Sequence, residues 1–407
     1  MTTSGKTLDP TLESTLDSPG EAVSGAKPHS HGVGVVPRSS RAEWFSSHDV
    51  AAFEQPSGRE EIWRFTPMKR IAGLHTGVEA TGTVSIEVDT SPEVTVETVA
   101  RTDERLGAGG VPADRVAAQA YSSFTEATVL TVGREVRAGK PAVVTITGPG
   151  EGKVAYGHLQ VRAEQFGEAV VVLDHRGSGV YADNVEFVLA DGAKLTVVSI
   201  QDWADDAVHI SAHHAAIGRD AVLKHTVVTI GGDVVRLSPT AKFVGKGAEV
   251  DMGGLYFANA GQHFEHRTFV DHAEQNCTSN VVYKGALQGE GAHTVWIGDV
   301  LIRAAAEGTQ TYELNRNLLL SDGARADSVP NLEIETGEIA GAGHASATGR
   351  FDDEQLFYLQ ARGIPEGQAR RLVVRGFFHE LLMKIDVPEV RERLEARIEA
   401  ELEAVGG

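Results

Sequence analysis

Three similar stretches decide the fold: "ADGAKLTVVSI" at 190–200, "GRDAVLKHTVVTI" at 218–230 and "GKGAEVDMGGLYF" at 245–257. Each has a turn containing glycine, then an alanine, and then a short strand. The alanines are Ala193, Ala221 and Ala248, so the repeat has steps of 28 and 27 residues. Glycine-punctuated strands at such a period predict a β-solenoid, in which each coil stacks on its neighbour. An antiparallel sandwich stays open as the alternative.

The pattern changes along the chain define four regions. Residues 1–40 are rich in Ser, Thr, Gly and Pro and are predicted to be flexible. Residues 41–83 mix aromatic residues with short helical patterns and are predicted to form an N-terminal helical region. Residues 84–345 show the period-two alternation of strands, with no long helical run, and form the predicted solenoid core. Residues 346–407 are predicted to be a C-terminal helical domain.

The final helix of that domain has one narrow apolar stripe. Its stripe residues recur every four positions and are Val390, Leu394, Ile398 and Leu402. Such a stripe either packs on its own domain or docks in the groove of a partner. The first of these two is the favoured prediction.

Composition excludes several classes of function. The formal charge is −20, from 37 basic and 57 acidic residues, and such a field repels phosphate backbones and anionic membranes. We therefore expect no nucleic-acid partner and no membrane. The one cysteine, Cys277, allows no disulfide within the chain, and no apolar run reaches the length of a spanning helix. A cytoplasmic location is the expectation.

The motifs of common enzymes fail in this sequence. The nearest match to a phosphate-binding loop is "GPGEGKV" at 148–154, where the glycine spacing is short and Val154 replaces the metal-binding Ser or Thr. "HELLM" at 379–383 has Met383 where a zinc protease needs its second histidine. We expect a non-catalytic protein that does not itself hydrolyse ATP.

The histidines form two groups along the sequence, and their roles stay open. One group is His209, His213, His214 and His225, and the other is His263, His266 and His272. On strands, a spacing of three places His263 and His266 on opposite faces. Each group is either a metal site or a set of surface and core imidazoles. Cys277 is predicted to be a small buried apolar residue, since no local cation lowers its pKa.

A further histidine, His344, lies in the small-residue stretch "GAGHASATG" at 341–349. It has no catalytic neighbour, so it makes little sense as a general base in its own chain. The small residues around it would let another backbone come close. It is either a hydrogen-bonding residue in a turn or interface, or a ligand in a site completed by another polypeptide.

Several long, ordered stretches resemble the SufB/SufD family of the SUF iron–sulfur cluster assembly machinery. They are "REEIWRFTPMKRI" at 59–71, "HRTFVDHAEQNCTSNVVYKGAL" at 266–287, "TYELNRNLLLSDGARADSVPNLEIETGEI" at 311–339, "GHASATGRFDDEQLFYLQARGI" at 343–364 and "RGFFHELLMKI" at 375–385. The first of these is similar to the amino-terminal signature of the SufD branch. The resemblance is dense over the last third of the chain and patchy from 85 to 255.

The resemblance implies a mainly β fold: a right-handed parallel β-helix flanked by N-terminal and C-terminal helical regions. It also implies a non-catalytic scaffold subunit that pairs with SufB through the ends of the β-helices and docks the ABC-type ATPase SufC. His344 matches the histidine that the family places at the SufB–SufD interface, as a ligand of a shared, transient iron–sulfur cluster. Ala342 stands where SufD proteins often carry cysteine, so the isolated chain is expected to hold no stable cofactor.

The resemblance further implies that the C-terminal helices around 351–385 form the SufC dock. Its candidate residues are Phe357, Arg375, Phe377, Phe378 and Glu380. Exposed β-helix edges also make a homodimer plausible when the chain is isolated. Cluster type, and whether iron or flavin is delivered here, stay open.

Two rival functions come from other classes. A β-helix carbohydrate-active enzyme, such as a lyase or esterase, would display acids and basic residues along one groove. A metal-binding protein that uses its histidine groups would take up metal as an isolated chain.

Overall fold

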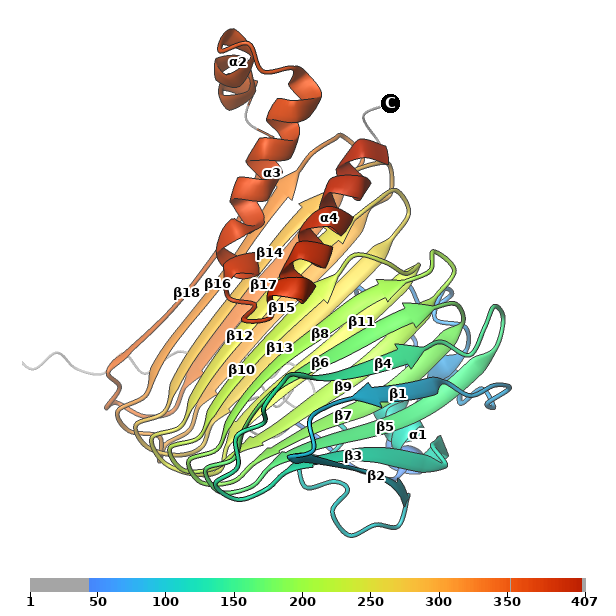
Figure 1. Ribbon diagram of the computed structural model, residues 1–407, viewed down its shortest axis with the longest axis vertical. Coiled ribbons are helices and arrows are strands. Elements are labelled where there is room, and N and C mark those ends of the chain that lie inside the picture. The colour runs from blue at the N-terminus through green and yellow to red at the C-terminus, as the bar shows by residue number, and fades with distance from the viewer. Residues whose placement is uncertain (1–43, 352, 405–407) are drawn as a thin grey trace, which may run out of the picture. The chain divides into compact units, whose positions relative to one another are not determined.

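The computed structural model describes residues 44–351 and 353–404, and its core is a parallel β-solenoid (Figure 1). Two nine-stranded sheets have the orders β1-β4-β6-β8-β10-β12-β14-β16-β18 and β17-β15-β13-β11-β9-β7-β5-β3-β2. We call them sheet A and sheet B. From β3 onward the chain alternates between them, so each coil contributes one strand to each sheet. The predicted solenoid is confirmed, and the antiparallel sandwich is excluded.

The strands have the following bounds. Sheet A contains β1 (Ser85–Asp89), β4 (Ala142–Thr147), β6 (Glu168–Gly177), β8 (Lys194–Trp203), β10 (Val222–Thr229), β12 (Glu249–Ala258), β14 (Thr278–Leu287), β16 (Gln310–Leu319) and β18 (Gly341–Arg350). Sheet B contains β2 (Val94–Ala100), β3 (Glu126–Val132), β5 (Val154–Ala163), β7 (Val180–Leu189), β9 (Val208–Ile217), β11 (Val234–Phe243), β13 (His263–His272), β15 (His293–Ile302) and β17 (Arg325–Ile334). Only the first pairs, β1–β4 and β2–β3, are antiparallel.

The sequence repeat corresponds to the strand register. Lys194, Val222 and Glu249 pair across β8, β10 and β12, with the same steps as the alanines that precede them. Each alanine is fully buried at the corner where a strand begins. Cys277 occupies the equivalent corner before β14 and is also buried, as predicted. Burial raises the pKa of its thiol, which suits a packing residue rather than a nucleophile.

The space between the sheets is filled by inward-facing side chains of both. The apolar members form one continuous core along the solenoid. Glycines make room for the largest of them: a Cβ on Gly254 would lie 1.9 Å from the ring of Tyr283, and one on Gly285 would lie 1.9 Å from that of Tyr256. Any larger residue there would displace a buried tyrosine.

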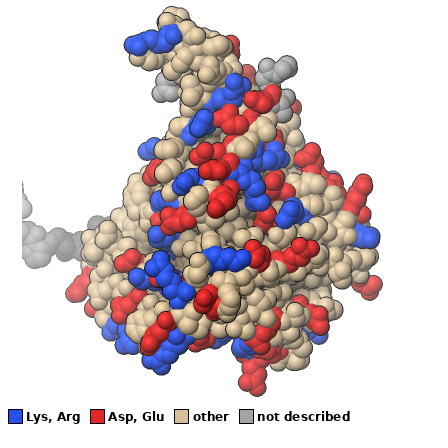
Figure 2. Space-filling view, in the orientation of Figure 1, with Lys and Arg blue, Asp and Glu red and all other residues tan. Residues whose placement is uncertain are grey.

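The C-terminal segment forms α2 (Asp353–Ala361), α3 (Glu366–Met383) and α4 (Pro388–Ala404). In Figure 1, α3 and α4 lie across sheet A, whereas α2 stands clear of the strands. The stripe of α4 packs on this chain: Leu394 and Ile398 are buried against residues of β8, β10 and β12. Figure 2 shows acids and bases interleaved over this face. They include the ion pairs Arg393–Asp174 and Lys384–Asp251.

The prediction of a helical region at 41–83 is wrong. Between residues 44 and 83 the structure has only the 3-10 turns η2 (Val50–Ala52) and η3 (Leu74–Thr76). The helix of this part is α1 (Arg115–Ser123), inside the range predicted to form the solenoid core. The Asp114 side chain caps it by accepting from the Ala117 N–H at 2.9 Å. The predicted segment 1–40 lies outside the described residues.

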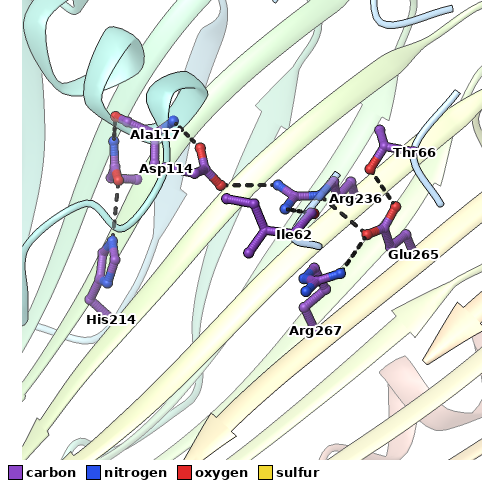
Figure 3. A network of polar contacts seen from close by, with 9 residues as sticks. Ile62, Thr66, Asp114, Ala117, His214, Arg236, Glu265 and Arg267 are labelled. Carbon is purple, nitrogen blue, oxygen red and sulfur yellow. Dashed lines mark hydrogen bonds and ion pairs between the residues drawn. The ribbon is translucent and has the colours of Figure 1, made fainter. Parts of the chain in front are cut away.

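The N-terminal segment and α1 cover the outer face of sheet B. Trp63, Ile71 and Leu74 are buried there against strand residues. Figure 3 shows the polar contacts beside them. The Arg236 guanidinium donates to Asp114 and to the Ile62 carbonyl, while Glu265 accepts from Thr66 at 2.7 Å. These buried charges are mutually compensated, so the network serves to hold the segment in place.

Candidate functional site

His344 lies on β18, the last strand of sheet A and the outermost strand on that side in Figure 1. Its imidazole is exposed. The predicted solenoid core ends at residue 345, but β18 continues to Arg350, so His344 lies within a strand rather than at a boundary. The histidine therefore belongs to the last coil, whose far side carries no other strand among the described residues.

The backbone of β18 presents an open edge at His344 itself. The Gly341 N–H donates to the Thr309 carbonyl and the Phe351 N–H to the Leu319 carbonyl, so odd-numbered residues face β16. Alternate residues of a strand bond to opposite sides. The N–H and C=O groups of the even-numbered residues, His344 and Ser346 among them, consequently point away from the solenoid.

The other strand of the last coil, β17, has a less complete edge. The Arg325 N–H donates to the Ala292 carbonyl, just before β15, and the Glu335 N–H to the Ile302 carbonyl, so there too the even-numbered residues face outward. Pro330 occupies one of those outward positions and has no N–H to donate. The uninterrupted free edge of the coil is therefore that of β18, which carries His344.

A buried carboxyl group neighbours His344 on β16. Glu313 is its register partner, so the two side chains project from the same face of strands about 4.8 Å apart. Glu313 is 1% exposed, and neither carboxyl oxygen has a hydrogen-bond partner. Burial, with a smaller contribution from Asp299, raises its pKa to about 8. At neutral pH the open end thus offers an imidazole beside a protonated carboxylic acid.

No thiolate is present at this end. Ala342 lies two residues before His344, partly buried against the core. A surface hollow of about 690 Å³ borders Ala342, Gly343 and Tyr312. Iron bound here would meet nitrogen and oxygen donors from this chain, and any thiolate would have to come from elsewhere.

The five candidate docking residues differ in exposure. Phe357 on α2 is 71% exposed, and Arg375 on α3 is exposed beside Glu399 at 3.4 Å. Phe377 is partly buried, and Glu380 accepts from the Lys284 ammonium at 2.8 Å. Phe378 was wrongly placed among them: it is 0% exposed, because its ring fills the core between α3 and sheet A.

The two sequence groups of histidines do not come together as groups. His263 and His266 point to opposite faces of β13, as the spacing predicted: His263 lies 3.2 Å from His293, and His266 contacts Thr229 inside the solenoid. His214 faces outward toward Asn184. His209 instead meets His175 and Asp183, which belong to neither sequence group.

Among the described residues, no helix is long and apolar enough to cross a membrane.

Comparison with known proteins gives one family. The model of the SUF-system FeS cluster assembly SufBD core domain matches residues 144–377. The iron–sulfur cluster assembly SufBD family protein of Mycobacterium bovis is 66% identical over 370 residues, which cover 89% of this chain and 93% of that protein.

Mycobacterium leprae has two similar proteins of the same family name. One is 63% identical over 365 residues, covering 88% of this chain and 93% of the relative. The other is 26% identical over 233 residues, covering 57% of this chain and 26% of a longer relative. The chain belongs to the SufB/SufD family of iron–sulfur cluster assembly proteins.

Proposed function

We propose that this chain is the SufD-type, non-catalytic subunit of a cytoplasmic iron–sulfur assembly scaffold, and that it pairs with a SufB-type subunit through β18. The observation that carries the proposal is the free edge of β18, with His344 on it. An unpaired strand edge is a template for a strand of another chain. Backbone hydrogen bonds between this edge and a strand of the partner would bring the partner's residues next to the imidazole.

Two different family members in one organism support a heteromeric pair. Mycobacterium leprae has one relative of this chain's length and one that is much longer and more distant. The closer relative resembles this chain over nearly its whole length, so this chain corresponds to the shorter member. A homodimer of the isolated chain would use the same edge.

The cluster is the cargo of the proposed pair. His344 would donate one imidazole, and the Glu313 carboxyl beside it would exchange its proton or bind iron when the edge is covered. Thiolates, which iron–sulfur clusters prefer, would come from the partner. With no thiol at this end, the chain would hold no stable cluster alone.

The proposed ATPase dock lies on α2 and α3. Phe357, Tyr358 and Leu372 are exposed apolar side chains on these helices, at 71%, 56% and 43%. Large exposed apolar residues that lie close together are typical of protein-binding surfaces. The failed phosphate-loop match agrees with ATP hydrolysis by a partner such as SufC.

The test is co-expression of the chain with its SufB-type and SufC-type partners, followed by size-exclusion chromatography with light scattering. The decisive variant is Ser346→Pro, which removes one outward N–H and leaves the hydrogen bonds to β16 intact. The matched control, Ser346→Ala, keeps that N–H. We expect the proline variant to lose the complex and the alanine variant to keep it. A wild-type chain that stays alone beside both partners would contradict the proposal.

A further inference from the structure

Inside the solenoid, far along the chain from His344, three potential metal ligands lie together. His175 is on β6, Asp183 on β7 and His209 on β9. All three are buried, and one ligand atom from each lies within 4.8 Å of the others. Among the described residues this is the one cluster of three or more His, Cys, Asp or Glu with that geometry. We propose that it binds a divalent first-row transition-metal ion.

The hydrogen bonds around His209 leave a suitable nitrogen for the ion. Its Nδ1 lies 2.8 Å from Gln201 Oε1 and 3.2 Å from the Trp203 indole nitrogen, which itself lies 2.8 Å from Gln201 Oε1. Its Nε2 lies 3.0 Å from Asp183 Oδ1. An ion bound by Nε2 and Asp183 would leave the ring proton on Nδ1, where Gln201 Oε1 accepts it.

His175 has the complementary arrangement. Its Nδ1 lies 3.1 Å from the Ile200 carbonyl oxygen, which accepts an N–H, and 3.2 Å from the Gln201 Nε2, which donates one. Its Nε2 has no hydrogen-bond partner, although the ring is 0% exposed. An unpartnered buried nitrogen costs free energy unless something binds it. Metal-bound histidines typically donate their other N–H to a carbonyl or carboxylate, and the Ile200 and Gln201 oxygens lie within reach of the two Nδ1 atoms.

The charges favour a cation. All three residues are buried, so the cluster places two imidazole rings and one carboxyl group in a dry interior. A buried carboxylate needs a counter-charge.

The ligand set selects the class of ion. Two imidazole nitrogens and one carboxylate oxygen suit zinc or ferrous iron, whereas calcium and magnesium prefer oxygen alone. Ligands held at about 2.1 Å around a tetrahedral ion lie about 3.4 Å apart. From a spread of up to 4.8 Å, the ligand atoms would move together by up to about 1.4 Å on binding, with water as the fourth ligand.

A second histidine pair in the same interior provides a matched control. His213 Nδ1 and His225 Nε2 lie 2.9 Å apart, also fully buried, beside the apolar ring of Phe187. No carboxylate is among their hydrogen-bond partners. A variant of this pair should disturb the core about as much as a variant of the cluster, without removing a ligand.

The experiment uses the full chain, stripped with a chelator and then refolded with either Zn²⁺ or Co²⁺, because a buried site fills most readily while the coils assemble. After desalting, metal content is measured by mass spectrometry, and Co²⁺ coordination by visible absorption. We expect one equivalent of metal and a Co²⁺ spectrum of nitrogen and oxygen ligands. We expect Asp183→Asn, of nearly the same shape, to lower the affinity at least about tenfold. His213→Gln should bind as the wild type does.

Two results would overturn the proposal: wild-type chain that retains no metal after refolding, or Asp183→Asn chain that retains as much as the wild type. Circular dichroism checks that each variant is folded, and the wild-type Co²⁺ spectrum is informative without any variant. His344→Ala should retain the metal, so the outcome is independent of the proposed cluster site.

Discussion

Glu313 provides the sharpest quantitative prediction, because it is a buried carboxyl group without a hydrogen-bond partner. Its pKa rises from the ordinary value of 4.5 to about 8 in the folded chain. The folded state therefore holds the proton more tightly than the unfolded state does. The contribution of this group to the free energy of unfolding is most favourable below pH 4.5 and is lost as the pH rises toward 8. We predict that Glu313→Gln, which cannot ionise, abolishes this pH dependence.

The magnitude follows from the difference in pKa. At pH 7 the Glu313 carboxyl of the folded chain is still protonated. In the unfolded chain it is ionised, because pH 7 lies about 2.5 units above its pKa there. At about 1.36 kcal/mol per unit, the wild type carries a penalty of about 3 kcal/mol that the variant lacks. At pH 5 the unfolded carboxyl is about three-quarters ionised, so the gain should fall to about 0.8 kcal/mol.

The assay is urea unfolding of the isolated chain at pH 5, 6, 7 and 8, at one protein concentration. The matched control is Glu249→Gln, which changes an exposed carboxylate at the start of β12 and should show no such trend. A Glu313→Gln effect that is equal at pH 5 and pH 8 would refute the reasoning, because it would mean that the carboxyl ionises normally in the fold.

The remaining predictions concern the proposed partners. His344→Ala should leave complex formation intact and reduce iron–sulfur cluster assembly on the anaerobic complex; unchanged assembly would remove the imidazole from the site. Phe378→Ala should destabilise the chain by about 3–5 kcal/mol, seen as an earlier thermal transition, because it empties part of a packed core. Phe357→Ala should leave that transition unchanged and weaken binding of the ATPase in a pulldown; equal binding would place the dock elsewhere.

The sequence repeat predicted the solenoid because one feature of each coil is local. A small residue must fit at each buried corner, and Ala193, Ala221 and Ala248 mark those corners in the sequence. The next corner departs from this pattern, because Cys277 replaces alanine there. The spacing then lengthens to 29 residues between Glu249 and Thr278.

The helices were harder to predict because more than one surface buries them. In α3 the sequence places Ala369, Leu372, Val373 and Phe377 at helical spacing, yet Leu372 is 43% exposed and Phe378 is fully buried. Ala369 at the start of α3 packs against Phe351 and α2, while residues from Val374 onward pack on sheet A. A single periodic stripe does not describe a helix whose two halves contact different neighbours.

The polar residues of the interior could not be assembled from sequence. Glu313 and His344 are 31 residues apart, and only the strand register places them side by side. Asp183 and His209 likewise depend on the pairing of β7 with β9. Alternation within a strand shows which residues face inward, but it does not show which of them meet across the solenoid.

Amide hydrogen exchange of β18 tests the central claim most directly, since the claim concerns its free edge. The chain is compared alone and in complex with its SufB-type partner, with exchange resolved to single amides. The odd-numbered amides already donate to β16 and should be slow in both states. We predict that the amides of Ala342, His344, Ser346 and Thr348 exchange quickly in the free chain and slowly in the complex. Unchanged exchange at these four amides, with protection on another surface, would contradict the account.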